Sequence, residues 1–343
     1  MKFGVFDHLD DAGAPLGQLY SDRLRVAEAY DQAGIYGYHL AEHHATPLGC
    51  ATSPGLFLAA MAQRTKTLRF GPMVYLLPFY HPLRLIEEIC MLDQMSGGRL
   101  DLGVGRGVSP FELAHFGVEL KEAQPMYLEA YEVVMKALSS RVLDFEGRYY
   151  RFSRVPVMLE PFQKPHPPLW YGLSNPQSVD WAAKTALNVV SNAAPEAVRR
   201  VTERYRAEWT RLGNDPKRLP FVGMTRHLVL AESDREALEA GRRSYRRWYE
   251  SFAFLWREHK APLPQTVTYT EDFDGVLENG QAIAGSPETV RKALLKQAAE
   301  TGVNYFLLRF AFGDLSLAES ARSVELFAKH VMPGFEASRA PAA

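Results

Sequence analysis

Short apolar runs alternate with helical segments along almost the whole chain, and few folds accommodate that order. Eight runs have the length and composition of buried strands: Lys2–Asp7, Tyr38–Glu42, Leu68–Tyr75, Arg99–Gly105, Pro168–Gly172, Leu187–Ser191, Phe221–Ala231 and Tyr305–Phe310. Strands that alternate with helices form a parallel sheet. No GxGxxG string follows the first run, which weakens the alternative of an open dinucleotide-binding sheet. We therefore predict an α/β protein with a (β/α)8 barrel, the TIM barrel.

Two segments interrupt this alternation. The sequence predicts a small hairpin over Val142–Val157, within an insertion at about residues 140–165 that comes after the fourth strand. The segment His259–Ala284 comes after the seventh strand and its helix, is rich in Pro, Thr, Asp and Gly, and has the length typical of a lid. Because a single barrel commonly takes about 250 residues or more, we expect one catalytic domain over residues 1–335 and a flexible tail over residues 336–343.

Composition argues against several classes of partner. The 343 residues carry a formal net charge of −1, so electrostatics gives no reason to expect a nucleic acid or an anionic membrane as a partner. No run approaches the roughly 18 apolar residues of a membrane span. Cys50 and Cys90 lack metal-site or redox spacing, and the first residues do not form a signal peptide. We expect reduced thiols in a cytoplasmic protein.

The string Glu42-His43-His44 ends the second predicted strand, where a barrel places its active site. A metal site that also used His8 would indicate a barrel metallohydrolase. Successive strand residues point to opposite faces, however, and HExxH spacing is absent, so no metal is expected. A structural histidine pair is a second possibility. We favour an acid/base pair in a catalytic pocket, because imidazole titrates near neutral pH and a buried carboxylate can orient it.

Two turns could bind an anion. Gly105-Arg106-Gly107 ends the fourth predicted strand, and glycine amides with a guanidinium suit a phosphate. A tight turn with a solvated arginine explains the same string. Ser174 and Asn175 follow the fifth strand, and either could cap the next helix and share its N-terminal dipole with a phosphate. A plain helix cap without a ligand explains them equally well.

The order of these motifs resembles that of a known family. The strings that carry the resemblance are Leu40–His44 (LAEHH), Leu77–Pro82, Leu92–Leu100 (LDQMSGGRL), Gly103–Gly107 (GVGRG), Asp180–Ala183 and Val331–Pro333. Together they resemble the bacterial luciferase-like family of flavin-dependent oxidoreductases over nearly the whole chain. The resemblance implies a (β/α)8 barrel, reduced FMN as a loosely bound cosubstrate, molecular oxygen, and a small organic substrate such as an aldehyde.

The resemblance also implies roles for individual residues. His43 matches the catalytic histidine, and Glu42 matches the buried acid beside it, which would fix the tautomer of His43. Arg106 matches the arginine that holds the FMN phosphate. The other residues expected to contact the cofactor are Gly105, Gly107, Ser174, Asn175, Ser178 and, at the flavin ring, Met73 and Val74, which are expected to share a cis peptide bond. The segment His259–Ala284 matches a mobile lid over the flavin.

The implied reaction is a two-component monooxygenation in which a separate flavin reductase supplies reduced FMN. Two alternatives on the same barrel stay open: deazaflavin-dependent hydride transfer, and flavin binding without catalysis. Gly105 stands where the light-emitting enzyme has a cysteine, and Ser174 stands where it has an acidic residue. Neither light emission nor a long-chain aldehyde is therefore expected. The apolar helix Ser53–Ala62 favours a homodimer.

Overall fold

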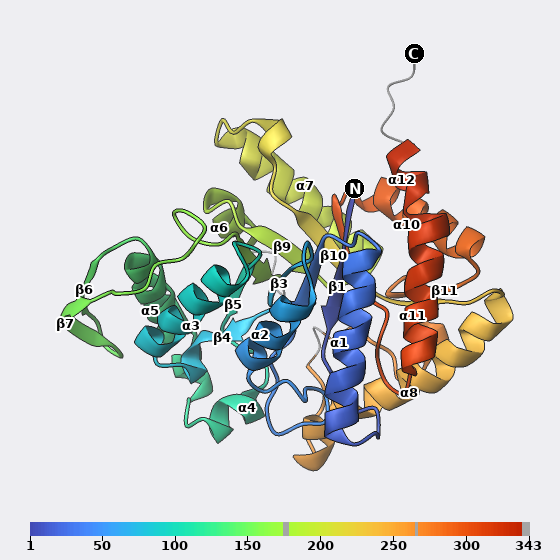
Figure 1. The fold of residues 1–343 in the computed structure, drawn as a ribbon, viewed down its shortest axis with the longest axis horizontal. Coiled ribbons are helices and arrows are strands. Elements are labelled where there is room, and N and C mark those ends of the chain that lie inside the picture. Colours follow the sequence, from blue (N-terminus) through green and yellow to red (C-terminus); the bar gives the residue numbers. More distant parts are fainter. Residues whose placement is uncertain (174–177, 265–266, 338–343) are drawn as a thin grey trace.

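The alternating segments fold into a barrel of parallel strands with helices on its outside (Figure 1). The structure is a computed structural model that describes residues 1–173, 178–264 and 267–337. Neighbouring strands follow the order β3-β2-β1-β12-β10-β9-β8-β5-β4. Their bounds are β1 Lys2–Asp7, β2 Gly37–Leu40, β3 Arg69–Pro72, β4 Tyr75–Leu76, β5 Leu102–Gly105, β8 Leu169–Gly172, β9 Asn188–Ser191, β10 Val222–Leu230 and β12 Tyr305–Arg309. The predicted (β/α)8 barrel is confirmed.

The third strand of the barrel is divided into two pieces. β3 pairs with β2 on one side, and β4 pairs with β5 on the other. A bridge between Phe70 and Leu100 joins β3 to the segment that leads into β5 and closes the ring. Counting β3 and β4 as one interrupted strand gives the eight strands that the sequence predicts. The interruption falls within the run Leu68–Tyr75, which the sequence alone presents as continuous.

Helices cover the outside of the barrel and bury their apolar faces against it. Proline at the first helical position begins several of them, where its missing amide hydrogen costs nothing. The helices are α1 Leu16–Gln32, α2 Pro54–Arg64, α3 Pro82–Met95, α4 Pro110–His115, α5 Leu120–Leu138, α6 Ser178–Lys184, α7 Pro195–Arg211, α8 Asp234–Glu258, α9 Phe273–Glu278, α10 Pro287–Thr301, α11 Leu317–Leu326 and α12 Pro333–Ala337. Short turns over Leu77–Phe79 and Pro216–Arg218 and a π-helical stretch over Phe327–Val331 complete the described part.

Two insertions depart from the βα repeat. β6 (Val142–Glu146) and β7 (Arg151–Pro156) form an antiparallel hairpin outside the barrel sheet, where the sequence predicts one. The expected irregular segment His259–Ala284 instead contains α9 and leads into β11 (Ala282–Gly285), which pairs in parallel with the end of β10. The tail was predicted to begin at residue 336, but α12 continues to Ala337. Residues 338–343 lie outside the described part.

Large side chains fill the amino-terminal half of the barrel interior. Tyr305 and Trp170 are almost completely buried there, and the Tyr305 hydroxyl lies 3.1 Å from Nε2 of His39. Gly4 and Gly37 leave room for Tyr305, because a Cβ on Gly4 would overlap the tyrosine hydroxyl. Since the interior is blocked at this end, a ligand can enter only at the carboxyl ends of the strands. β1 begins near the label N, so these ends face the lower side of Figure 1, where α4 lies.

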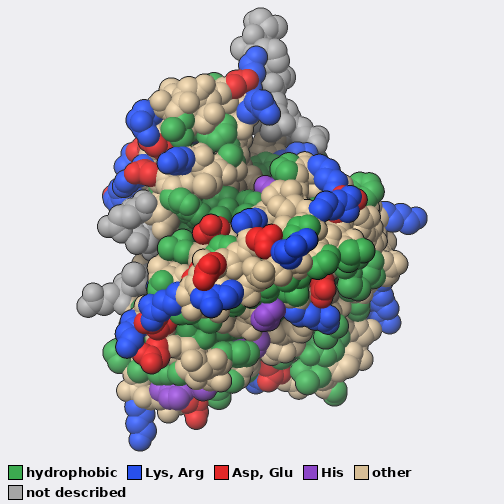
Figure 2. Space-filling model, turned by 90° about the vertical axis from the view of Figure 1, so that its left-hand side faces the viewer, with side chains coloured by type: hydrophobic (Ala, Val, Ile, Leu, Met, Phe, Trp, Pro, Cys, Tyr) green, Lys and Arg blue, Asp and Glu red, His purple; other side chains and the backbone are tan. Residues whose placement is uncertain are grey.

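The molecular surface carries charges of both signs. On the face shown in Figure 2, basic and acidic side chains are mixed with apolar ones, and neither sign forms a continuous patch. This mixture agrees with the net charge of −1. Within residues 1–173, 178–264 and 267–337, none of the helices has both the length and the apolar composition needed to cross a lipid bilayer.

Candidate active site

A pocket of about 370 Å³ opens at the carboxyl ends of the barrel strands. Residues at or near the carboxyl ends of β1, β2, β3, β4, β5, β8, β9 and β12 line it, together with Thr225 within β10, and the carboxyl-terminal half of α8 forms one wall. The volume falls in the range of about 300–1,000 Å³ that is typical of small-molecule sites. This end of the barrel is also where barrel enzymes carry their active sites.

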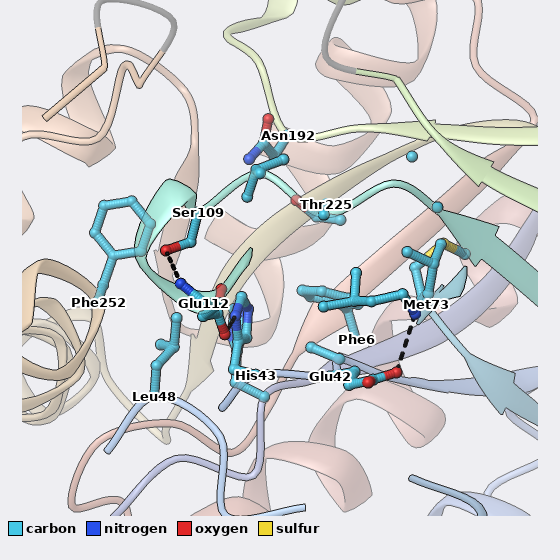
Figure 3. A pocket seen from close by; sticks show the side chains of 18 of the residues that line it. Phe6, Glu42, His43, Leu48, Met73, Ser109, Glu112, Asn192, Thr225 and Phe252 are labelled. Carbon is cyan, nitrogen blue, oxygen red and sulfur yellow. Dashed lines mark hydrogen bonds and ion pairs between the residues drawn. The ribbon is translucent and has the colours of Figure 1, made fainter. Parts of the chain in front are cut away.

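His43 faces this pocket and is oriented by an acid from a distant part of the chain. Its Nδ1 lies 3.2 Å from Oε1 of Glu112 in α4 (Figure 3). The same oxygen accepts a 2.7 Å hydrogen bond from the backbone amide of His44. Ser109 caps α4 by accepting a hydrogen bond from the Glu112 amide, which fixes the start of this short helix. Because a carboxylate can only accept, Nδ1 of His43 carries the hydrogen, and Nε2 of the neutral imidazole is left as an acceptor.

The environment keeps the Glu112 carboxylate ionised. Burial alone would raise its pKa, but attraction to His43 in its protonated form and the hydrogen bonds from His43 and from the His44 amide outweigh burial and hold the pKa of Glu112 below its ordinary value. The Glu112 side chain is 3% exposed, whereas that of His43 is 20% exposed. A ligand in the pocket would therefore meet the imidazole, with the carboxylate behind it.

Glu42 does not orient His43, and this part of the prediction is wrong. Oε1 of Glu42 lies 2.8 Å from Nε2 of His44, and Oε2 accepts a 3.1 Å hydrogen bond from the Leu76 amide. Residues two apart in an extended segment share a face, so Glu42 and His44 meet while His43 points the other way. Burial raises the pKa of Glu42 despite its hydrogen bonds to His44 and Leu76. Glu42 still lines the pocket, and a catalytic role for it stays a prediction.

Arg106 lines the pocket directly after β5 and is half-buried. Its Nε donates a 3.1 Å hydrogen bond to the carbonyl of Gly107, and no carboxylate in the described ranges pairs with the guanidinium. The turn itself requires the glycines, because Gly107 has a φ of 91° and a Cβ on Gly105 would overlap the Val74 side chain. An unpaired cation at a pocket wall suits a phosphate, and the phosphate-binding role of Arg106 stays a prediction.

Of the other residues expected at the cofactor, some line the pocket and two lie outside the described residues. The peptide bond between Met73 and Val74 is cis, as expected, and both residues line the pocket. Ser178, the first residue of α6, also lines it. Ser174 and Asn175 lie outside the described residues. The residues present fit a flavin nucleotide, because an unpaired arginine and the start of a helix lie in the same pocket as an apolar strand segment.

Aromatic side chains of α8 form the wall that faces the strand ends. Trp248 and Phe252 stack with their ring centroids 5.2 Å apart, and Trp256 continues the row one turn later. Tyr269, from the segment predicted to be a lid, packs against Trp248 at 5.2 Å. Phe252 lies on the same side of the pocket as Leu48 and Glu112, and Met73 lies on the other side (Figure 3). One part of the pocket is therefore lined by aromatic groups and the other by the arginine and the strand turns.

Sequence reasoning missed several residues of this pocket. Glu112 and the α8 aromatics were not predicted, because they come from helices and not from strand ends. The string Ser109-Pro110-Phe111-Glu112 has the spacing of a helix start, with an acid three residues after a serine. That signal could have located α4, but not the hydrogen bond from Glu112 to His43. Arg309 at the end of β12 was also missed, although it follows the same strand-end rule as the residues that were found.

The three histidines of the metal-site alternative have separate partners. His43 contacts Glu112, His44 contacts Glu42, and Nδ1 of His8 lies 3.3 Å from the indole nitrogen of Trp248. In the part of the chain that the structure describes, no three His, Cys, Asp or Glu side chains are arranged to hold a metal ion. The geometry thus gives no support to a barrel metallohydrolase.

Comparison with protein families identifies the sequence as a whole. Residues 1–305 match the sequence model of a family described as luciferase-like monooxygenase. A protein of Sinorhizobium fredii, the uncharacterized protein y4wF, is 42% identical over 320 residues, which cover 93% of each chain. The oxygenase component of a flavin-dependent trigonelline monooxygenase from Acinetobacter baylyi is 25% identical over 354 residues, which cover 99% of this chain and 97% of that protein.

Comparison of structures gives the same result for the fold. The monooxygenase RslO1 from Streptomyces bottropensis superposes with a TM-score of 0.87 and 28% sequence identity. The match covers 98% of this chain and 100% of RslO1. The likeness therefore extends over nearly the whole chain.

Proposed function

Because the chain belongs to the family of luciferase-like monooxygenases, we propose that it uses reduced FMN and molecular oxygen to oxygenate a small organic substrate. The observation that carries the proposal is the His43–Glu112 pair, which lies in one pocket with an unpaired arginine and an aromatic wall. The relative from Acinetobacter baylyi is described as an oxygenase component. This description supports a separate flavin reductase as the partner of the present chain.

The pocket offers a place for each end of the cofactor. Arg106 would hold the phosphate, with Ser178 at the amino-terminal end of α6 as a second contact. Met73 and Val74 would lie behind the flavin ring. When bound, reduced FMN supplies two electrons, so that one atom of O₂ can enter the substrate and the other can be reduced to water. A resident metal has no part in the proposal.

His43 would move a proton beside the reacting atoms. Its Nδ1–H is held by Glu112, so only Nε2 is free to accept or donate a proton on the pocket side. The ionised Glu112 stabilises the imidazolium that forms when Nε2 takes up a proton. A general acid or base held in this way typically contributes about 10²- to 10⁴-fold to a rate.

The aromatic wall would exclude water during turnover. Trp248, Phe252 and Trp256 cover one side of the pocket, and Tyr269 joins them from the predicted lid. The stack of Phe111 on His259, with centroids 4.1 Å apart, connects α4 to the start of that segment. Exclusion of water protects a reactive oxygen species from hydrolysis and strengthens the electrostatic interactions within the pocket.

A homodimer remains part of the proposal. Leu56 in α2 is 76% exposed, which is unusual for a leucine in an apolar helix. A second copy of the chain that packs against α2 would bury it. Sedimentation of the purified protein, compared with a Leu56→Lys variant, measures this directly.

The reaction class can be tested in a coupled assay with a flavin reductase, NADH, FMN and ¹⁸O₂ over a panel of aldehydes, ketones, aromatic acids and amines. The expected result is a product that carries one ¹⁸O atom and forms only when both proteins are present. A matched assay without oxygen, with a reduced deazaflavin in place of FMN, tests hydride transfer. Product formation in the second assay alone would replace the proposal with the deazaflavin alternative, and hydrogen peroxide as the sole product over the whole panel would contradict both.

A further inference from the structure

A second arginine in the pocket has no negatively charged partner. Arg309, the last residue of β12, is 2% exposed and lines the pocket. Its Nη1 donates a 3.2 Å hydrogen bond to the Tyr269 hydroxyl, while Nε is buried without any partner. Across the described side chains no carboxylate forms an ion pair with it. Nη2 has no hydrogen-bond partner among the described residues, so it can donate to an anionic ligand in the pocket.

Aromatic rings surround this cation and compensate only part of its burial. The guanidinium carbon lies 4.8 Å from the ring centroid of Phe6, 5.7 Å from that of Trp248 and 5.8 Å from that of Tyr269. Such contacts attract a cation, but they are weaker than the hydration that the guanidinium loses. A buried charge without a counter-ion costs stability, and proteins that retain one commonly use it to bind a ligand.

His8 adds a second hydrogen-bond donor next to Arg309. The indole N–H of Trp248 donates to Nδ1 of His8, so in the neutral imidazole the hydrogen must sit on Nε2. Burial and the nearby charge of Arg309 lower the pKa of His8 well below its ordinary value, which keeps the ring neutral. His8 lines the pocket, and its ring centroid lies 5.6 Å from that of His43. The two side chains thus present donors and no acceptor, an arrangement that favours an anionic oxygen.

The flavin phosphate cannot be the anion at this position if Arg106 holds it. Arg106 follows β5 and Arg309 ends β12, and these strands are four positions apart in either direction around the eight-stranded ring. The two arginines therefore lie on opposite sides of the barrel. The pocket has two cationic ends, with the aromatic wall next to the second one.

We propose that Arg309 and His8 form a subsite for the carboxylate of an aromatic substrate. The subsite deepens the proposed monooxygenase function and rests on it, because it names the class of compound that is oxygenated. Trp248 and Phe252 would stack against the substrate ring. With its carboxylate at Arg309 and His8, the ring of the substrate would lie beside His43 and the reacting end of the flavin.

The test compares aromatic acids with their uncharged amides. Calorimetric titration of the full chain with benzoate and benzamide, nicotinate and nicotinamide, and indole-3-carboxylate and its amide measures the preference for the charged form. The wild type should bind at least one acid about 10-fold more tightly than its amide, which corresponds to 1.4 kcal/mol. Arg309→Met should reduce this ratio to below about 3-fold, and Arg25→Met, which removes an exposed arginine of α1, should leave it unchanged.

Further measurements separate a ligand-binding role from a structural one. Because Arg309→Met removes a buried charge that has no counter-ion, its melting temperature should equal or exceed that of the wild type. Arg309→Gln, which keeps a polar group next to Tyr269, provides a second neutral variant if the methionine variant does not fold. Both should bind oxidised and reduced FMN within about two-fold of the wild type.

Three results would overturn the subsite. One is a wild type that binds no acid of the panel more tightly than its amide, and another is a preference that survives in both neutral variants. Weaker binding of reduced FMN to the Arg309 variants would also overturn it, by assigning the arginine to the flavin. Arg106→Ala distinguishes this failure from failure of the proposed function, because that variant should lose FMN affinity and keep the preference for acids.

Discussion

Replacing Arg106 by alanine gives a direct measure of the proposed phosphate interaction, provided that FMN is compared with riboflavin. Riboflavin carries the same ring system and lacks only the phosphate. Arg106 is half-buried, its single hydrogen bond in the protein joins its Nε to the carbonyl of Gly107, and its charge has no counter-ion among the described residues. If Arg106 holds the phosphate, the substitution removes that contact without leaving another buried charge unpaired.

The magnitude follows from the strength of one charge-assisted hydrogen bond. Such a bond contributes about 1.5–3 kcal/mol. Arg106 is only half-buried, so in the variant water can replace part of a second hydrogen bond to the phosphate. The expected loss therefore includes one hydrogen bond. A loss of 1.5–3 kcal/mol corresponds to a rise in the Kd of FMN of about 10- to 150-fold. The Kd of riboflavin should change by less than about two-fold, since riboflavin has no group for Arg106 to bind.

Titration of both flavins by fluorescence quenching, with the wild type, Arg106→Ala and Arg25→Ala, provides the data. Arg25 lies on the exposed face of α1, so its replacement controls for the loss of one positive charge. The wild type should prefer FMN to riboflavin, and Arg106→Ala should bind the two alike. If Arg106→Ala weakens both flavins by the same factor, or neither, then the arginine does not act on the phosphate and the assignment fails.

Two further predictions concern histidines. His43→Ala should slow substrate oxygenation by about 100-fold or more, while the Kd of FMN stays within about two-fold of the wild type. Glu112→Gln should slow oxygenation by about 10-fold, because its charge-assisted hydrogen bond to His43 becomes a neutral one. Equal effects on the rate and on flavin affinity would argue against both roles. Burial, and next the charge of Arg69, lower the pKa of His39 from 6.5 to about 3, so the unfolded chain binds a proton there that the folded chain does not. The protein therefore keeps its full stability at this group above about pH 6.5 and loses stability as the pH falls below that value. The free energy of unfolding of His39→Phe, measured with urea, should increase relative to that of the wild type by about 1.4 kcal/mol for each pH unit below 6.5. A difference between the two proteins that does not vary with pH would contradict this.

The sequence predicts the barrel well because buried strands consist mainly of apolar residues. All four residues of β5 are buried, and its apolar run Leu-Gly-Val-Gly is visible without any structure. Two site candidates were found for the same reason, since His43, predicted to be catalytic, and Arg106, predicted to bind the cofactor, come directly after such runs. The interruption of the third strand left no such mark, because Met73 and Val74 are as apolar as the strand around them.

The acid that orients His43 could not be predicted from the sequence. Glu42 is its neighbour in the chain, but alternation along an extended segment turns Glu42 toward His44. The actual partner, Glu112, is 69 residues away and reaches His43 through the turn after β5. Proximity in sequence is a poor guide to such a pair, because the barrel gathers the ends of all its strands around one pocket, whatever the length of the connecting helices.

The closed topology of the barrel also explains how one pocket can hold two unpaired arginines. Arg106 and Arg309 lie on opposite walls, which reduces their mutual repulsion, and each is left without a carboxylate in the described residues. A protein that only needed to be stable would replace either one with an apolar side chain. Two anions that enter from the same mouth, the flavin phosphate at one wall and the substrate carboxylate at the other, would neutralise both charges. They would also bring the flavin ring and the substrate together in the middle of the pocket, where Nε2 of His43 is free to exchange a proton.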